Sequence, residues 1–206
     1  MRRYFSGLST NTFLLALASL FADTSTEMLY PVLPVFLTQT LGARVSIVGL
    51  VEGITQATQN IVQGLSGWIS DRLKQRKPIA LLGYALAAVA KPLIGLSTGW
   101  SGVLGARALD RLGAGARSAP RDALIAASAN EASRGRAFGL EGMGDNLGAC
   151  LGPLIAIALL TLVHVNVRSI FFFAFVPGVL ATLMILFVRE TPTAADSKAK
   201  LDLSVC

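Results

Sequence analysis

Charged side chains interrupt long apolar stretches of this chain, at positions where a charge surrounded by lipid would be costly. The acids are Asp23, Glu27, Glu52, Asp110, Asp122, Glu141 and Asp145, and the bases among them are Arg107, Arg111, Arg117 and Arg121. Burial favours the protonated form of a carboxyl group, whereas a nearby guanidinium favours the carboxylate. A movement that changed the pairing would therefore bind or release a proton. A cationic or zwitterionic substrate could compete with that proton for the same carboxylates.

The spacing of these residues places them on shared helix faces. Asp23 and Glu27 are four residues apart, so they lie on one face of a helix, and Glu141 and Asp145 form a second such pair. The charges of residues 107–121 follow a helical stripe that cannot face lipid, which favours a proton or substrate site. The alternative is that these charges only neutralise one another as buried ion pairs, for example Arg107 with Asp110 or Glu141.

The composition determines the kind of element that must position these charges. With 53% hydrophobic and 15% charged residues and a mean hydropathy of +0.61, it excludes an ordinary soluble domain. A helix needs about 20 mostly apolar residues to cross a bilayer. Six segments meet that length, near 12–38, 46–70, 78–98, 101–128, 136–163 and 168–188. We therefore predict an all-α, multi-pass membrane protein, with a six-span unit over residues 1–190 in the lipid bilayer and a polar tail over 191–206.

Four of the six segments have polar faces and are predicted to line a cavity. The segments near 78–98 and 168–188 are almost wholly apolar and are predicted to pack outside it. The Lys and Arg residues of the connections collect on the side that holds both termini, which predicts cytoplasmic termini in the cell's inner membrane. The same bias accounts for the net charge of +6, so we expect no nucleic-acid partner.

The sequence contains no constellation typical of catalysis or metal binding. His164 is the only histidine, and Cys150 and Cys206 are isolated, so neither a metal-ligand spacing nor a nucleophile with its base is present. We expect no enzymatic activity, no metal and no cofactor.

A glycine and charge motif lies between the second and third predicted spans. The run Gly67-Trp68-Ile69-Ser70-Asp71-Arg72, followed by basic residues, resembles motif A of the major facilitator superfamily. Lys74 and Gln75 depart from the family pattern, which has a glycine and a basic residue there. The gating residues that the resemblance implies are Gly67, Asp71, Arg72 and Arg76, with Arg117 or Arg121 as partners near the cytoplasmic end.

Two further motifs support the resemblance. Val103-x-x-x-Arg107 is similar to motif B, which implies a role for Arg107 in proton coupling, although Arg111 stands where the pattern often has glycine. Gly139, Gly148, Gly152 and Pro153 are similar to motif C, which is typical of antiporters, although the closing glycine pair is absent. Apart from the family pattern, Gly144, Gly148 and Gly152 at four-residue spacing predict a close contact between helices.

The superfamily is built from two six-helix halves with the transport site between them. The resemblance covers one half, up to about residue 190, and implies a proton-coupled exporter of a small molecule. Asp23 and Glu27 are the expected proton or cation sites and Arg107 their counter-charge, with Glu141 and Asp145 as secondary candidates. The chain is then a truncated or split half that needs a second half, or a half that pairs with a second copy. The alternative is a non-transporting membrane scaffold or an inactive truncated fragment.

Overall fold

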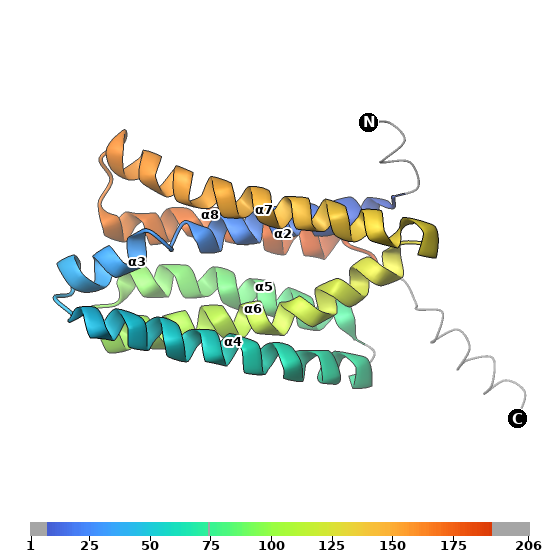
Figure 1. Ribbon diagram of the computed structural model, residues 1–206, viewed down its shortest axis with the longest axis horizontal. Coiled ribbons are helices and arrows are strands. Elements are labelled where there is room, and N and C mark those ends of the chain that lie inside the picture. The colour runs from blue at the N-terminus through green and yellow to red at the C-terminus, as the bar shows by residue number, and fades with distance from the viewer. Residues whose placement is uncertain (1–7, 74, 191–206) are drawn as a thin grey trace, which may run out of the picture.

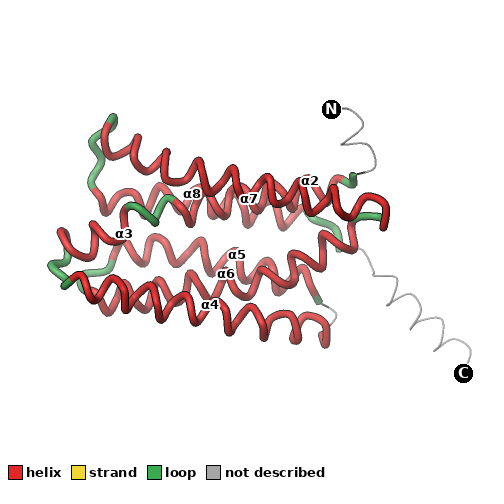
Figure 2. The backbone as a smooth tube through the Cα atoms, in the orientation of Figure 1, coloured by secondary structure: helices red, strands yellow, loops and turns green. Residues whose placement is uncertain are grey.

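The computed structural model describes residues 8–73 and 75–190, with the backbone alone at Asp71 and Leu73. These residues form helices joined by short loops, and none of them lies in a strand (Figures 1 and 2). The helices are α2 (Thr10–Glu27), α3 (Val32–Val35), the π-helix η1 (Phe36–Thr40), α4 (Val45–Leu73), α5 (Arg76–Leu96), α6 (Trp100–Ser128), α7 (Glu131–Thr161) and α8 (Val167–Phe187). The structure has the predicted all-α class, and the predicted tail, 191–206, lies outside the described residues.

The first predicted segment, 12–38, is a broken helix. α2 ends at Glu27, and Pro31 precedes the short helix α3, which leads directly into η1. Proline has no backbone N–H and cannot continue the hydrogen-bond ladder, which explains the interruption.

Three of the described helices, α5, α7 and α8, are long and apolar enough to cross a membrane when judged by length and composition. The other long helices, α2, α4 and α6, contain the acids and arginines noted above, and α4 also contains several amide side chains, all of which lower their hydropathy. The count of six spans therefore stays a prediction for those three helices.

The long helices form two groups of three (Figure 1). In one group α6 packs against α4 and α5, and in the other α2 packs against α7 and α8. The two apolar helices, α5 and α8, pack on each other and join the groups, whereas α6 approaches α2 and α7 only sparsely. Polar side chains that reach from α6 to α2 or α7 therefore lie at the boundary between the groups.

Apolar cores occupy both ends of the bundle. One contains Met28, Phe36, Val51, Ile94, Val103 and Phe171, and the other contains Leu15, Tyr84, Leu124, Ala137 and Ile185. On α6, Val103 belongs to the first core and Leu124 to the second, so the charged residues 107–121 lie between them. This arrangement surrounds the charges with a low-dielectric environment, in which ion pairs are strong and unpaired groups are costly.

Glycines of α7 bring it close to α2. A side chain at Gly144, Gly148 or Gly152 would begin within 2.7 Å of a backbone oxygen of α2, so only glycine fits there. Gly139 is exposed, and Pro153 lies within α7 without ending it. The spacing of four residues thus produces the close packing that positions the acids of α2 beside those of α7.

Candidate functional site

Helix α6 supplies the arginines of the site. Arg107, Asp110, Arg111 and Arg117 are all buried, and Arg121 is 14% exposed. Because the helix advances about 1.5 Å per residue, Arg111 and Arg117 are separated by about 9 Å along its axis. The charges accordingly form two groups, which we call the outer cluster, around Arg107, and the inner cluster, around Arg121.

The outer cluster is centred on Asp110, whose side chain is 1% exposed. Lys91 Nζ of α5 donates to Asp110 Oδ1 at 2.8 Å, and Arg107 Nη1 donates to Asp110 Oδ2 at the same distance. Lys91 also donates to the carbonyl oxygen of Ala87 at 2.9 Å. Glu52 of α4 adds an ion pair to Arg107, with 3.4 Å between Oε1 and Nη2.

Arg111 extends the outer cluster by one helical turn. Its Nη1 donates to Gln59 Oε1 on α4 at 3.0 Å. The outer cluster therefore joins α4, α5 and α6, which are the three helices of one group.

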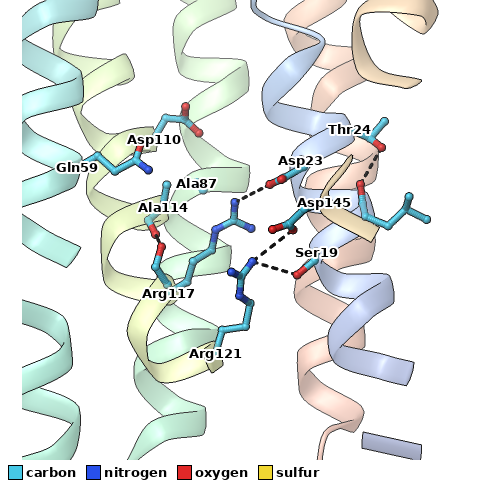
Figure 3. A network of polar contacts seen from close by, with 12 residues as sticks. Ser19, Asp23, Thr24, Gln59, Ala87, Asp110, Ala114, Arg117, Arg121 and Asp145 are labelled. Carbon is cyan, nitrogen blue, oxygen red and sulfur yellow. Dashed lines mark hydrogen bonds and ion pairs between the residues drawn. The ribbon is translucent and has the colours of Figure 1, made fainter. Parts of the chain in front are cut away.

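The inner cluster connects the two groups of helices (Figure 3). Arg117 Nη2 donates to Asp23 Oδ1 of α2 at 3.4 Å, and its guanidinium lies over the Tyr84 ring, 4.6 Å from the centroid. Arg121 Nη1 lies 2.9 Å from Glu141 Oε1 and 3.4 Å from Asp145 Oδ1, both on α7.

A hydroxyl group completes the inner cluster. Ser19 of α2 accepts a hydrogen bond of 3.0 Å from Arg121 Nη1 and donates one of 3.1 Å to Glu141 Oε1. Arg121 also pairs with the half-exposed Asp122 at 3.2 Å. Two arginines of one group therefore hold three carboxylates of the other group, two of them on α7 and one on α2.

The pairing of Arg107 with Asp110 is the one named in the ion-pair alternative, and it differs from the expected proton-coupling role. Arg107 was expected to be the counter-charge of Asp23 and Glu27, but it pairs with Asp110 and Glu52, because it lies two to three turns of α6 away from Arg117, which pairs with Asp23. Glu27 forms no hydrogen bond or ion pair with the described part of the chain, although its charge acts on Arg111.

Residues outside the predicted set also belong to the site. They are Ser19, Gln59, Tyr84 and Lys91. Lys91 is the only charge inside an otherwise apolar stretch of α5, and that isolation is the signal that could have identified it. Ser19 and Tyr84 carry no comparable signal, because polar uncharged residues are common in membrane helices.

The residues of motif A lie at the opposite end of the bundle from Trp100. Gly67 packs against Ala119 of α6, and the Arg72 guanidinium lies 5.2 Å from the centroid of the Trp68 ring. The Asp71 side chain lies outside the described residues, so its predicted pairing with α6 is not tested. Arg117 and Arg121, the predicted partners, are held by acids of α2 and α7.

Glu190 caps the helix that follows motif A. Its Oε1 accepts hydrogen bonds from the backbone N–H groups of Arg76 and Lys77, at 2.8 and 3.4 Å. A carboxylate at the first turn of a helix satisfies unpaired N–H groups and opposes the positive end of the helix dipole.

Neither a metal-ligand cluster nor the apolar groove beside α8 involves the charged clusters in the part of the chain that the structure describes. Within the described ranges, no three His, Cys, Asp or Glu side chains are placed to hold a metal ion. A groove of about 430 Å³ lies between α2, α7 and α8, and its lining is apolar apart from Thr24. Among these features, the groups that can exchange protons or bind charged molecules are therefore those of the buried ion pairs, not those of this groove.

Comparison with known proteins establishes the family. Residues 15–203 match the family model for the Major Facilitator Superfamily. The chain belongs to the major facilitator superfamily. It is 36% identical, over 191 residues, to an uncharacterised MFS-type transporter of Methanocaldococcus jannaschii, and the match covers 93% of this chain and 48% of that protein. It is 32% identical, over 133 residues, to the multidrug resistance protein MdtH of Photorhabdus laumondii, covering 65% of this chain and 33% of that one.

Solved structures show the same fold. The crystal structure of the peptide transporter POT in complex with alafosfalin superposes with a TM-score of 0.79 and 19% identity, over 98% of this chain and 45% of that one. The chain thus spans about half the length of the Methanocaldococcus jannaschii transporter and of POT, and about a third of MdtH. Membership of this superfamily makes it a multi-pass membrane protein of a transporter family and not an enzyme.

Proposed function

We propose that this chain forms one half of a proton-coupled exporter, which moves a small molecule across the cell's inner membrane by alternating access. The observation that supports the proposal is the inner cluster, in which Arg117 and Arg121 of one helix group hold Asp23, Glu141 and Asp145 of the other. Both chain ends would lie in the cytoplasm. The Asn11 side chain binds the backbone of Arg189, so the start of α2 and the end of α8 lie at the same end of the bundle.

The inner cluster has the properties that proton coupling requires. At this cluster α6 approaches α2 and α7 only sparsely, although α5 and α8 join the two groups, so a small movement of α6 would separate the guanidinium groups from the carboxylates. A separated carboxylate in this low-dielectric position would take up a proton, and re-formation of the ion pair would release it. Alternation between the two states couples proton transfer to the movement of the helices.

The test uses everted membrane vesicles, in which respiration acidifies the interior and a pH-sensitive dye reports the gradient. Candidate compounds are chosen by growth protection in an efflux-deficient host that expresses the chain. A compound exchanged for protons dissipates the gradient. We expect Asp23→Asn and Glu141→Gln to abolish this dissipation at unchanged protein levels.

The matched control is Glu131→Gln, which changes an exposed acid at the start of α7. This variant should dissipate the gradient as the wild type does. Wild-type proton exchange in both Asp23→Asn and Glu141→Gln would contradict the proposed role of these acids. A wild-type chain that exchanges protons with no compound would favour a non-transporting scaffold.

A second six-helix unit would complete the transporter, supplied by a further segment or by a second copy. Helices α4 and α7 leave small-residue faces uncovered, since a side chain at Gly49, Gly53, Gly135 or Gly142 would meet no atom within 4 Å. If a second copy completes the site, a tandem fusion of two copies retains transport and the purified chain is a dimer. A monomer without transport would show that a different second half is needed.

A further inference from the structure

The outer cluster contains more buried hydrogen-bond donors than acceptors. Arg107 is fully buried, and its Nε has no hydrogen-bond partner, while Nη1 donates to Asp110. Arg111 is 9% exposed and likewise has no partner at Nε, while Nη1 donates to Gln59. Asp110 already accepts hydrogen bonds from both Lys91 and Arg107. Because a buried guanidinium N–H without an acceptor is costly, this edge of the cluster is suited to a further acceptor.

Glu52 occupies this edge without satisfying it. Its carboxylate lies 3.4 Å from Arg107 Nη2, yet that nitrogen makes no hydrogen bond. The Glu52 side chain is 35% exposed, unlike Asp110. An ion pair that is long, partly exposed and not hydrogen-bonded is weak, so another anion could replace Glu52.

The charge balance favours an anion over a cation. Lys91, Arg107 and Arg111 carry three positive charges, and Asp110 and Glu52 carry two negative ones. If Glu52 moved away, two positive charges would remain unmatched within the cluster. The charge of Glu27 on α2 also acts on Arg111, without a hydrogen bond or ion pair between them.

We propose that the Arg107–Arg111 edge binds an oxyanion, either a carboxylate or a phosphate group of the transported molecule, which displaces Glu52. The planar guanidinium presents parallel N–H donors that match the two oxygens of such a group. This assignment rests on the proposed transport function, and it names the substrate class for the outer cluster. It differs from the cationic substrate considered from the sequence, because Asp23, Glu141 and Asp145 are already held by arginines.

The test measures binding by the full chain in lipid nanodiscs, by equilibrium dialysis and saturation-transfer NMR. Benzoate and inorganic phosphate are the anion probes, and tetramethylammonium is the cation probe. Glu52→Gln removes the competing carboxylate, and we expect it to bind an anion probe about threefold more tightly than the wild type. Arg111→Gln removes a donor, and we expect it to bind at least about tenfold more weakly.

Two further variants separate binding from folding. Arg168→Gln changes an arginine outside the cluster, which donates to the carbonyl oxygen of Ser97, and it should leave anion binding unchanged. Arg111→Lys keeps the charge but not the planar donors, and it should bind the anion with intermediate affinity. Thermal unfolding of each protein reports whether it is folded.

Anion binding should become tighter in Glu52→Gln and weaker in Arg111→Gln. A purely structural role of these residues would not change the affinity in opposite directions. Anion binding by Glu52→Gln that is no tighter than that of the wild type would overturn the inference. A wild-type protein that binds tetramethylammonium but neither anion probe would overturn it too. Proton exchange that persists without any anion binding would overturn this inference and leave the proposed function intact. Anion binding without proton exchange would support this inference and overturn the proposed function.

Discussion

Lys91 Nζ and Asp110 Oδ1 are joined by an ion pair of 2.8 Å in which each side chain is 1% exposed. The pair connects α5 to α6, and it introduces a charge into a helix that is otherwise apolar along this stretch. Asp110 also holds Arg107, so one carboxylate organises two cations. The pair is thus the link between the apolar α5 and the charged stripe of α6.

Removing one member of this pair should be strongly destabilising. Lys91→Met leaves Asp110 with a single cation, and breaking a buried ion pair costs about 3–5 kcal/mol. Thermal unfolding in detergent measures the effect. Lys77→Met is the control on the same helix, because its ammonium donates to the Leu186 carbonyl at an exposed site, where a loss below about 1.5 kcal/mol is expected. Equal melting of the two variants would show that the buried pair contributes nothing.

Arg121 should matter far more for stability than its exposed partner does. Arg121→Gln leaves Glu141 buried without its cation, which costs about 3–5 kcal/mol. Asp122→Asn removes a partner that is 48% exposed, and such pairs contribute about 0–1 kcal/mol. Hydrogen exchange along α7 provides the second measurement, with faster exchange near Glu141 in Arg121→Gln alone. Similar exchange in both variants would contradict a link between the two helix groups at this residue.

The glycine face of α7 should not tolerate side chains. A Cβ at Gly148 would lie 2.6 Å from the Leu20 carbonyl oxygen, so Gly148→Val must push α7 away from α2. We expect a loss of about 1–3 kcal/mol, the usual cost of overpacking, measured by thermal unfolding. Gly142→Ala is the control on the same helix, since nothing lies within 4 Å of its Cβ. Unchanged stability of Gly148→Val would contradict the close packing.

The contact of Gly67 with Ala119 predicts a disulfide between α4 and α6. A Cβ at Gly67 would lie 3.3 Å from the Cβ of Ala119, close to the separation that a disulfide spans. Gly67→Cys combined with Ala119→Cys, in a chain whose two cysteines are replaced by serine, should cross-link under mild oxidation. The pair Gly64→Cys and Ala119→Cys is the control, because Gly64 faces open space. Cross-linking is scored by gel mobility before and after reduction. Equal yields from both pairs would contradict the alignment of α4 and α6 in which Gly67 lies against Ala119.

The cap that Glu190 provides should be visible at the start of α5. Glu190→Ala leaves the Arg76 and Lys77 N–H groups without their acceptor. We expect faster hydrogen exchange of these two amides, with no change in the middle of α5. Glu190→Gln retains an acceptor oxygen and should protect them partly. Wild-type exchange in Glu190→Ala would show that this carboxylate does not cap the helix in solution.

The local sequence pattern was enough to predict much of the helical framework and many of the charged residues of the site. Apolar segments of sufficient length predicted helices, and the spacing of Gly144, Gly148 and Gly152 predicted a close helix contact. The break after Glu27 was missed, although Pro31 signals it, because the apolar character of the segment continues through the proline. Six membrane crossings were predicted from the sequence, whereas three of the described helices are both long and apolar enough to cross a membrane.

The pair of Arg107 and Asp110 within one helix could be named from the sequence, but the pairing of charges between helices could not be predicted. Helical spacing determines which residues of one helix share a face, so the stripe from Arg107 to Arg121 was recognisable. It does not determine which helix lies opposite or at what depth, and Arg107 was therefore assigned to Asp23, which Arg117 holds. Lys91 was omitted from the site for the same reason, since its partner Asp110 comes from another helix.

The sequence by itself thus determined the helical class, the family resemblance and the side chains that must avoid lipid, because these depend on hydropathy and periodicity along one chain. The tertiary structure decided that Arg121 holds α7, that Lys91 completes the outer cluster and that the two arginines of the outer cluster retain unpaired donors. Those relationships depend on the axial offset between neighbouring helices. Packing sets that offset, through glycine contacts such as Gly148 against Leu20, and no local pattern encodes it.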